Sequence, residues 1–486
     1  MTAAFQRRGV IEGFYGRPWT ASQRLEFVDF IGARGMNCFA YAPKDDPLLR
    51  QAWQHPFAAE QVAHMAELRT ACDRWGIRLL VCVSPGLTLR YADPADVAAL
   101  TAKLEAAVAA GAHDVGLLLD DIPDRLQHPA DRSAFDSLAQ AQAQVVTELH
   151  GRLSAVPDRD EVGLAICPTL YCGYGDEDYL AELAAGLPAS VDLFWTGRAI
   201  CSTTLDLADA DTFAATTGRP PWYWDNYPVN DLAMIWEAHL GPYRGRDPRL
   251  AHASRGVIAN PMELFESTKI PIATIADFLS DPTGYEPEES WLRAITHVVA
   301  GPAPSPEGEA DAAAFATYAD NVRVSCLEPS DSPHLSRLLE ELAFATAVGG
   351  PPEITTAAGA ITAYAATLSA AVARIQSPRF SNPALATEQA PWLNVASIGA
   401  EALAALGGIV GSTAGLADAA TAAQQIATAV APHLARLRQQ RHRVFGDVLD
   451  MTLADYVDLR HTPITGPITA PTVAPIPGDT AQKGTP

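Results

Sequence analysis

Eight short apolar segments alternate with helix-like stretches over the first 260 residues, and this alternation limits the folds open to the chain. The segments carry β-branched and aliphatic residues without polar alternation, which is the pattern of strands buried on both faces. They are residues 8–12, 37–41, 77–84, 114–120, 161–167, 191–195, 221–224 and 256–260. The helix-like stretches with the clearest apolar spacing are residues 22–34, 58–75, 94–110 and 133–153. The pattern predicts a parallel (β/α)8 barrel of the TIM type.

An open, doubly wound sheet is the alternative α/β architecture. Such a sheet usually carries a glycine-rich phosphate loop after its first strand, with the spacing G-x-G-x-x-G. Residues 12–16 read EGFYG, which does not have that spacing. The barrel is therefore the preferred interpretation.

The composition changes near residue 300. Residues 301–309, GPAPSPEGE, are typical of a linker or a long loop. Residues 310–460 are rich in alanine and leucine at helical spacing, which predicts an all-α helical bundle after a barrel domain at residues 1–300. Residues 461–486 are rich in proline and threonine, and we expect a disordered tail there.

Charge and composition limit the partners of the chain. The 34 Lys and Arg residues against 57 Asp and Glu residues give a net charge of −23, which disfavours nucleic acid and anionic membranes. The N-terminal residues lack the apolar core of a signal peptide, and the apolar runs elsewhere are interrupted by polar residues. We therefore expect a soluble, cytoplasmic protein. Three of the seven cysteines fall inside predicted strands, which favours buried thiols over a disulfide framework.

Two adjacent carboxylates, Asp120 and Asp121, close the fourth predicted strand after three leucines. In a barrel, the carboxyl ends of the strands form the functional face. Neighbouring carboxylates disfavour each other's ionisation, so one of the two is expected to have a raised pKa and to serve as a general acid beside an ionised partner. The alternative is an ordinary loop start or a helix cap.

Other strand ends are also polar or aromatic. Lys44 follows the second strand, where it could donate to a ligand hydroxyl or balance negative charge. Residues 222–227, WYWDNY, follow the seventh strand, and aromatic faces beside amides and carboxylates are typical of carbohydrate sites, although core packing is the alternative. The histidines show no metal-binding spacing, and no nucleophilic Ser or Cys pattern is present, so neither a metal nor another cofactor is predicted.

These segments together resemble glycoside hydrolase family 84, which contains β-N-acetylglucosaminidases and protein O-GlcNAcases. The resemblance covers about residues 8–280 in the order of the family and continues, more weakly, into the helical region. The segments that carry it are GVIEGFYGRPW (9–19), YAPKDD (41–46), SPG (84–86), LDDI (119–122), CPTLYCG (167–173), WTG (195–197), WDN (224–226), ND (230–231), LGPY (240–243) and GVIANP (256–261).

The resemblance implies a retaining, exo-acting hydrolase that removes terminal β-linked N-acetylglucosamine by substrate-assisted catalysis. In this chemistry the 2-acetamido oxygen of the substrate attacks the anomeric carbon and forms an oxazoline, so no enzyme nucleophile is needed. By resemblance, Asp120 orients the acetamido N–H and Asp121 is the general acid and base. Tyr171 is similar to the hydroxyl that binds the acetamido oxygen, Trp224 to a wall of the acetamido pocket, and Asn226 to an amide beside it.

Four further positions resemble the contacts to the sugar hydroxyls: Gly13, Lys44, Asp231 and Asn260. Two positions depart from the family pattern, since Leu170 stands where glutamate is frequent and Arg198 where proline is frequent. Both lie near the expected mouth of the barrel, so they bear on the leaving group rather than on the aspartates.

Two other functions remain open at this stage. One is an inactive sugar-binding or scaffold protein that retains the pocket. The other is the same chemistry on small glycan or cell-wall fragments rather than on glycosylated protein. Whether two copies form a homodimer through the helical domain is equally open.

Overall fold

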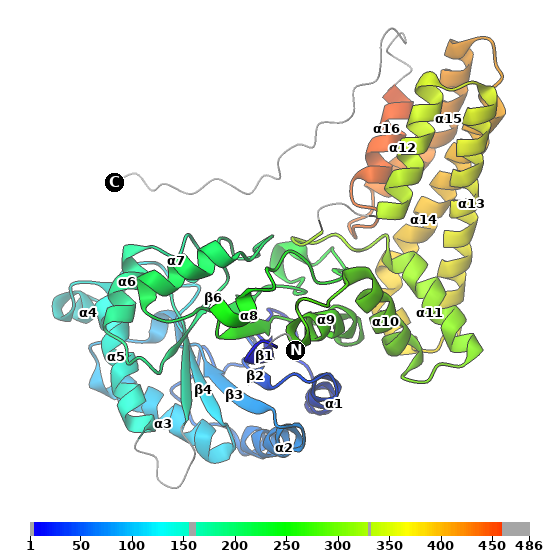
Figure 1. Ribbon diagram of the computed structural model, residues 1–486. Helices are drawn as coiled ribbons and strands as arrows, with labels where there is room; N and C mark the ends of the chain where they lie inside the picture. The colour runs from blue at the N-terminus through cyan, green and yellow to red at the C-terminus, as the bar shows by residue number, and fades with distance from the viewer. Residues whose placement is uncertain (1–3, 155–161, 329–331, 459–486) are drawn as a thin grey trace.

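The structure, a computed structural model, describes residues 4–154, 162–328 and 332–458. Its N-terminal part is a closed barrel of eight parallel strands in sequential order (Figure 1). Strand β1 pairs with β8, with Arg7 opposite Gly256, so the sheet has no free edge. The predicted barrel is confirmed, and the open sheet is excluded. The strands are β1 (Arg7–Glu12), β2 (Cys38–Tyr41), β3 (Arg78–Val83), β4 (Asp114–Leu118), β5 (Gly163–Cys167), β6 (Asp192–Trp195), β7 (Trp222–Asp225) and β8 (Gly256–Ala259).

Helices connect the strands and cover the outside of the barrel. The prediction of one continuous helix at 133–153 is wrong. Helix α4 ends at Ala134, and a new helix starts after Ser137, whose side chain accepts a hydrogen bond from the Gln140 amide. The elements are α1 (Ala21–Gly32), α2 (Ala59–Trp75), η1 (Gly86–Thr88), α3 (Pro94–Ala110), α4 (Pro129–Ala134), α5 (Leu138–Leu153), α6 (Asp178–Ala185), α7 (Leu207–Thr217), η2 (Leu232–Met234), α8 (Leu250–Ala253) and α9 (Phe265–Ser280).

The strands bury side chains on both faces. Ile11, Cys38 and Phe194 belong to one apolar cluster, whereas their strand neighbours Val10 and Phe39 belong to a second cluster with the surrounding helices. Successive strand residues point to opposite faces, so both faces need apolar residues, and this explains the missing polar alternation. All seven cysteines are free, and four of them are buried.

A helical region follows the barrel and stands beside it (Figure 1). Its core joins Trp291, Leu339 and Leu403 with Leu240 and Met262 from the last loops of the barrel. The segment between α10 and α11 is only residues 301–305, shorter than the expected linker. The predicted tail, 461–486, lies outside the described residues. The helices are α10 (Pro287–Ala300), α11 (Pro306–Ala319), α12 (Pro333–Val348), α13 (Pro351–Ile375), α14 (Pro383–Thr413), α15 (Ala419–Arg438) and α16 (Val448–Asp458).

Two helices of this region, α13 and α14, are long and apolar enough to cross a membrane by length and composition. The expectation of no such segment was therefore wrong. Their interrupting residues are mainly small Gly, Ser and Thr side chains, which lower the hydropathy little. Here the two helices pack against each other, and Leu368 and Leu403 are fully buried in the shared core.

Candidate active site

Asp120 and Asp121 lie just beyond β4, which ends at Leu118, at the carboxyl end of the barrel. Asp120 is buried, while the Asp121 side chain is about one-third exposed. Asp121 has a φ of 58°, a left-handed conformation that few residues with a Cβ adopt and that Asp tolerates better than most. The pair does not cap a helix, because α4 begins only at Pro129 and His128 occupies its N-cap position.

Lys44, in the loop after β2, links the two carboxylates. Its buried Nζ lies 2.7 Å from Oδ2 of Asp120 and 3.7 Å from Oδ2 of Asp121. Burial alone would lower the pKa of Lys44, but the charge of Asp120 and its other neighbours raises it above the ordinary value. Lys44 is therefore an ammonium ion that faces both aspartates.

Two tyrosine hydroxyls donate to Asp121. The Tyr15 hydroxyl lies 2.6 Å from Oδ2, and the Tyr171 hydroxyl 3.1 Å from Oδ1. Burial raises the pKa of Asp121, but the charge of Lys44 and these two hydrogen bonds outweigh burial, so the pKa lies below its ordinary value. The expectation that repulsion between the carboxylates raises the pKa of one of them is thus not met at Asp121, because it left out the cation and the hydroxyls.

A second group of predicted residues comes from the ends of β7, β8 and β1. Oδ1 of Asn226 accepts from Nε1 of Trp224 at 2.9 Å and from Nδ2 of Asn260 at 3.0 Å. Oδ1 of Asn260 in turn accepts from the backbone N–H of Gly13 at 3.3 Å. A Cβ at Gly13 would lie 2.7 Å from the Trp224 ring, so only glycine lets the backbone approach this wall.

Asp231 lies in the loop after β7 and joins the site through Tyr15. The backbone N–H of Tyr15 donates to Oδ2 of Asp231 at 2.6 Å, while the hydroxyl of the same residue donates to Asp121. Burial raises the pKa of Asp231. Tyr15 therefore spans the distance between the two carboxylates.

The structure brings all nine predicted site residues into one network. Lys44 joins the two groups, because its Nζ lies 5.7 Å from the centre of the Trp224 ring. Tyr15 was not predicted as a site residue, although it belongs to the same EGFYG segment as the predicted residue Gly13. Its contact with Asp121 spans 106 positions, so only the folded chain shows it.

Charged residues that support the site were also missed. Glu12, at the end of β1, is fully buried and binds the Arg24 guanidinium through contacts of 2.6 and 2.8 Å. Asp225, at the end of β7, accepts from Arg246 and from the Tyr243 hydroxyl. Both carboxylates close strands beside a predicted site residue, and their position at the strand ends was the available signal.

One oxygen at the centre of the site has no hydrogen-bond partner. Oδ1 of Asp120 is buried and accepts nothing from the part of the chain that the structure describes. A buried carboxylate oxygen without a donor is costly. Since Lys44 fixes the other oxygen of the same carboxylate, Oδ1 is an acceptor held in a defined orientation.

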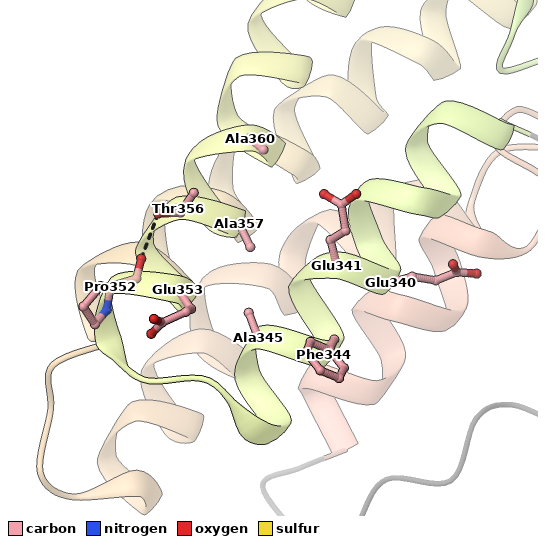
Figure 2. A pocket seen from close by; sticks show the side chains of 9 residues that line it. All are labelled: Glu340, Glu341, Phe344, Ala345, Pro352, Glu353, Thr356, Ala357 and Ala360. Atoms are coloured by element: carbon pink, nitrogen blue, oxygen red, sulfur yellow. Dashed lines mark hydrogen bonds between the residues drawn. The ribbon is translucent and has the colours of Figure 1, made fainter.

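A separate groove of about 610 Å³ lies on the helical region between α12 and α13 (Figure 2). Apolar side chains such as Phe344 and the carboxylates of Glu340, Glu341 and Glu353 line it, without a cation or a paired acid and base. Within the described ranges, no group of three or more His, Cys, Asp or Glu residues is arranged to hold a metal ion. The predicted site residues all lie at the barrel mouth, away from this groove.

Comparison with known proteins identifies the family of the chain. Residues 8–317 match the β-N-acetylglucosaminidase family over well more than half of the chain. The chain belongs to this family. This family is glycoside hydrolase family 84, which confirms the resemblance seen in the sequence.

Named relatives extend the comparison. Proteins called protein O-GlcNAcase from Rattus norvegicus and Mus musculus are each 32% identical over 274 residues, which is 55% of this chain and 29% of theirs. The match thus spans less than a third of these relatives. The solved structure of a mutant O-GlcNAc hydrolase from Thermobaculum terrenum has a TM-score of 0.83 and 31% identity, and the match covers 94% of this chain and 95% of that one.

One of the two departures from the pattern of family 84 has a clear structural role. Arg198 makes a two-pronged ion pair with Asp209 at the start of α7, with contacts of 2.7 and 2.5 Å. Its guanidinium also lies 4.7 Å from the centre of the exposed Tyr174 ring. Arg198 thus ties the loop after β6 to α7 and supports an aromatic side chain in the loop after β5.

Proposed function

We propose that the protein is a retaining, exo-acting β-N-acetylglucosaminidase that uses substrate-assisted catalysis. The acetamido oxygen of the bound sugar attacks the anomeric carbon and expels the aglycone, whose oxygen receives a proton from Asp121. The intermediate is an oxazolinium ion, the protonated form of the oxazoline, because the acetamido N–H stays on nitrogen and faces Asp120. Water then attacks the anomeric carbon while Asp121, now ionised, takes a proton from that water, and the C–O bond of the ring breaks to restore the acetamido group. The sugar is released with its original β configuration.

The unpartnered Oδ1 of Asp120 is the observation that carries this proposal. An acetamido N–H is the donor that such an oxygen lacks. A hydrogen bond there orients the acetamido oxygen and stabilises the positive charge that develops on nitrogen as the ring closes. Lys44 binds the other oxygen of Asp120 at 2.7 Å and so fixes the carboxylate in the orientation that this role needs.

Asp121 has to become an acid when the substrate is bound. In the free site, the Tyr171 hydroxyl is one of the donors that lower the pKa of Asp121. We propose that Tyr171 turns to the acetamido oxygen in the complex, which removes that donor, while the sugar shields Asp121 from water. Both changes raise the pKa of Asp121 toward the range in which it can donate a proton.

We further propose that the aglycone is a polypeptide that carries O-linked N-acetylglucosamine. The names of the rat, mouse and Thermobaculum relatives support this choice. Exposed Tyr174, Ile200 and Leu232, in the loops after β5, β6 and β7, add an apolar rim that suits side chains better than further sugar units. Small chito-oligosaccharides are the competing substrates.

Hydrolysis of an aryl β-N-acetylglucosaminide tests the chemistry. Asp120→Asn and Asp121→Asn should each lower kcat about 10²- to 10⁴-fold, while Asp29→Asn, on the outer surface, should match the wild type. Nuclear magnetic resonance should detect the β anomer first. Unchanged turnover in both site variants would refute the mechanism, and faster turnover of chito-oligosaccharides than of an O-GlcNAc peptide would refute the polypeptide substrate.

A further inference from the structure

The loop that carries Asp231 connects the sugar site to the helical region. It runs from residue 230 to residue 239 and folds onto itself, since Nδ2 of Asn230 donates to the Glu237 carbonyl at 2.8 Å. Within it, the Met234 amide donates to the Asp231 carbonyl at 2.9 Å. The position of Asp231 therefore depends on the position of the whole loop.

The far end of the loop binds to the helical region through Trp236. Its carbonyl accepts from Nε1 of Trp392 in α14 at 2.9 Å and from the Arg443 amide at 2.8 Å. The His442 ring contacts both tryptophans edge-on, at 5.2 Å from Trp236 and 4.7 Å from Trp392. Aromatic contacts and two donors thus fix one peptide group of the loop.

Contacts of the Glu237 carboxylate add a second attachment. Nη1 of Arg443 lies 2.9 Å from Oε1 of Glu237, and Oε2 of Glu237 lies 2.8 Å from Nε2 of the buried His239. Glu237 is the residue whose carbonyl accepts from Asn230, next to Asp231. Glu237 thus contacts Arg443 of the helical region with its side chain and Asn230, the neighbour of Asp231, with its carbonyl.

The barrel holds this loop near its two ends. The Tyr15 amide donates to the Asp231 carboxylate, and the Tyr227 hydroxyl donates to the His239 carbonyl. Leu232 and His239, near its two ends, have φ values of 51° and 47°, which residues with a Cβ rarely adopt. The side chains of Leu232 and Ile235 are 65% and 47% exposed, so the barrel does not bury them. The contacts with the helical region therefore help to keep the middle of the loop in one conformation.

We infer that Trp392, His442 and Arg443 are positioning residues that hold Asp231 against the outer hydroxyls of the sugar. The helical region is then part of the substrate-binding machinery. This inference rests on the proposed role of Asp231 in sugar binding. It assigns no proton transfer to the helical region, so these residues act on KM rather than on kcat.

The test compares Trp392→Phe and His442→Ala with Arg438→Ala, a control whose ion pair with Asp450 stays inside the helical region. Both positioning variants should raise KM for an aryl β-N-acetylglucosaminide about three- to tenfold at unchanged kcat. Combining either with Asp231→Asn should add no further loss, because both changes act through the same contact. The control should match the wild-type KM.

Hydrogen exchange of a peptide covering residues 230–239 gives a readout that does not need activity. Exchange should be faster in both positioning variants and unchanged in Arg438→Ala. Unchanged exchange, unchanged KM or losses that add to that of Asp231→Asn would each overturn the inference. A wild-type protein that does not hydrolyse the substrate would instead refute the proposed function, while the exchange data would still decide whether the helical region holds the loop.

Discussion

Replacing Lys44 by methionine should destabilise the protein in a pH-dependent way. The substitution removes the cation between Asp120 and Asp121 and leaves two carboxylates in partly buried positions. With an effective dielectric constant of about 20, the attraction of Lys44 to the two carboxylates is about 6 and about 4.5 kcal/mol at the observed 2.7 and 3.7 Å. Desolvation cancels much of this, and water screens the share of Asp121. Removing one partner of a buried pair typically costs about 3–5 kcal/mol, which is the loss expected at pH 7.

The loss should shrink as the pH falls. In the wild type, Lys44 helps to hold the pKa of Asp121 below its ordinary value. Such a carboxylate contributes stability above the pKa of the unfolded chain, about 4, and this contribution is lost as the pH falls through the lower folded pKa. In Lys44→Met the contribution is absent from the start. The free energies of unfolding of the two proteins should therefore converge below about pH 4.

Urea denaturation at several pH values measures both quantities. Lys103→Met is the matched control, because Lys103 is also buried but donates to the His55 carbonyl, and burial lowers its pKa to about 8. The contribution of Lys103 to the free energy of unfolding increases with pH, opposite to that of Asp121. Lys103→Met should therefore not show a loss of stability at pH 7 that disappears at low pH. A loss below about 1 kcal/mol for Lys44→Met at pH 7, or one that stays constant as the pH falls well below 4, would refute the reasoning.

Three further substitutions test other parts of the site. Tyr15→Phe removes a donor that lowers the pKa of Asp121, so the alkaline limb of kcat/KM for an aryl substrate should move to higher pH, and an unmoved limb would contradict the contact. Gly13→Ala places a Cβ against the Trp224 ring and should raise KM several-fold, whereas a wild-type KM would show that the ring can yield. Arg24→Met leaves Glu12 buried and unpaired and should cost about 3–5 kcal/mol in denaturation, with part of the loss restored by adding Glu12→Gln.

The barrel could be predicted because its signal is local and repeated. Each strand needs apolar residues on both faces, and this need recurs eight times in the sequence. The prediction was wrong where the signal is weak. One example is the interruption between α4 and α5, for which the capping side chain of Ser137 is the sequence signal. Likewise, the hydropathy of α13 and α14 is the same whether a helix packs against protein or lipid.

The site was predicted less completely, and its electrostatics least well. Strand ends and the family resemblance pointed to Asp120, Asp121 and Lys44, but a pKa depends on distances that sequence spacing does not contain. Adjacent aspartates suggested repulsion, while the fold places an ammonium ion 2.7 Å from one of them and two hydroxyls on the other. The pKa of Asp121 is lowered rather than raised because the residues that decide its direction lie far away in the sequence.

In the sequence, the helical region looks like a unit separate from the barrel. Its composition and periodicity differ from those of the barrel, and these are the features by which a sequence is divided into domains. The contacts that join it to the sugar site are few and distant in sequence, since Trp392 and Trp236 are 156 positions apart. No local pattern marks a carbonyl that accepts from a remote indole. If Trp392→Phe raises KM and adds nothing to the effect of Asp231→Asn, the helical region and the barrel share one function. The boundary near residue 300 then separates two patterns of packing in the sequence, but it does not separate two functional domains.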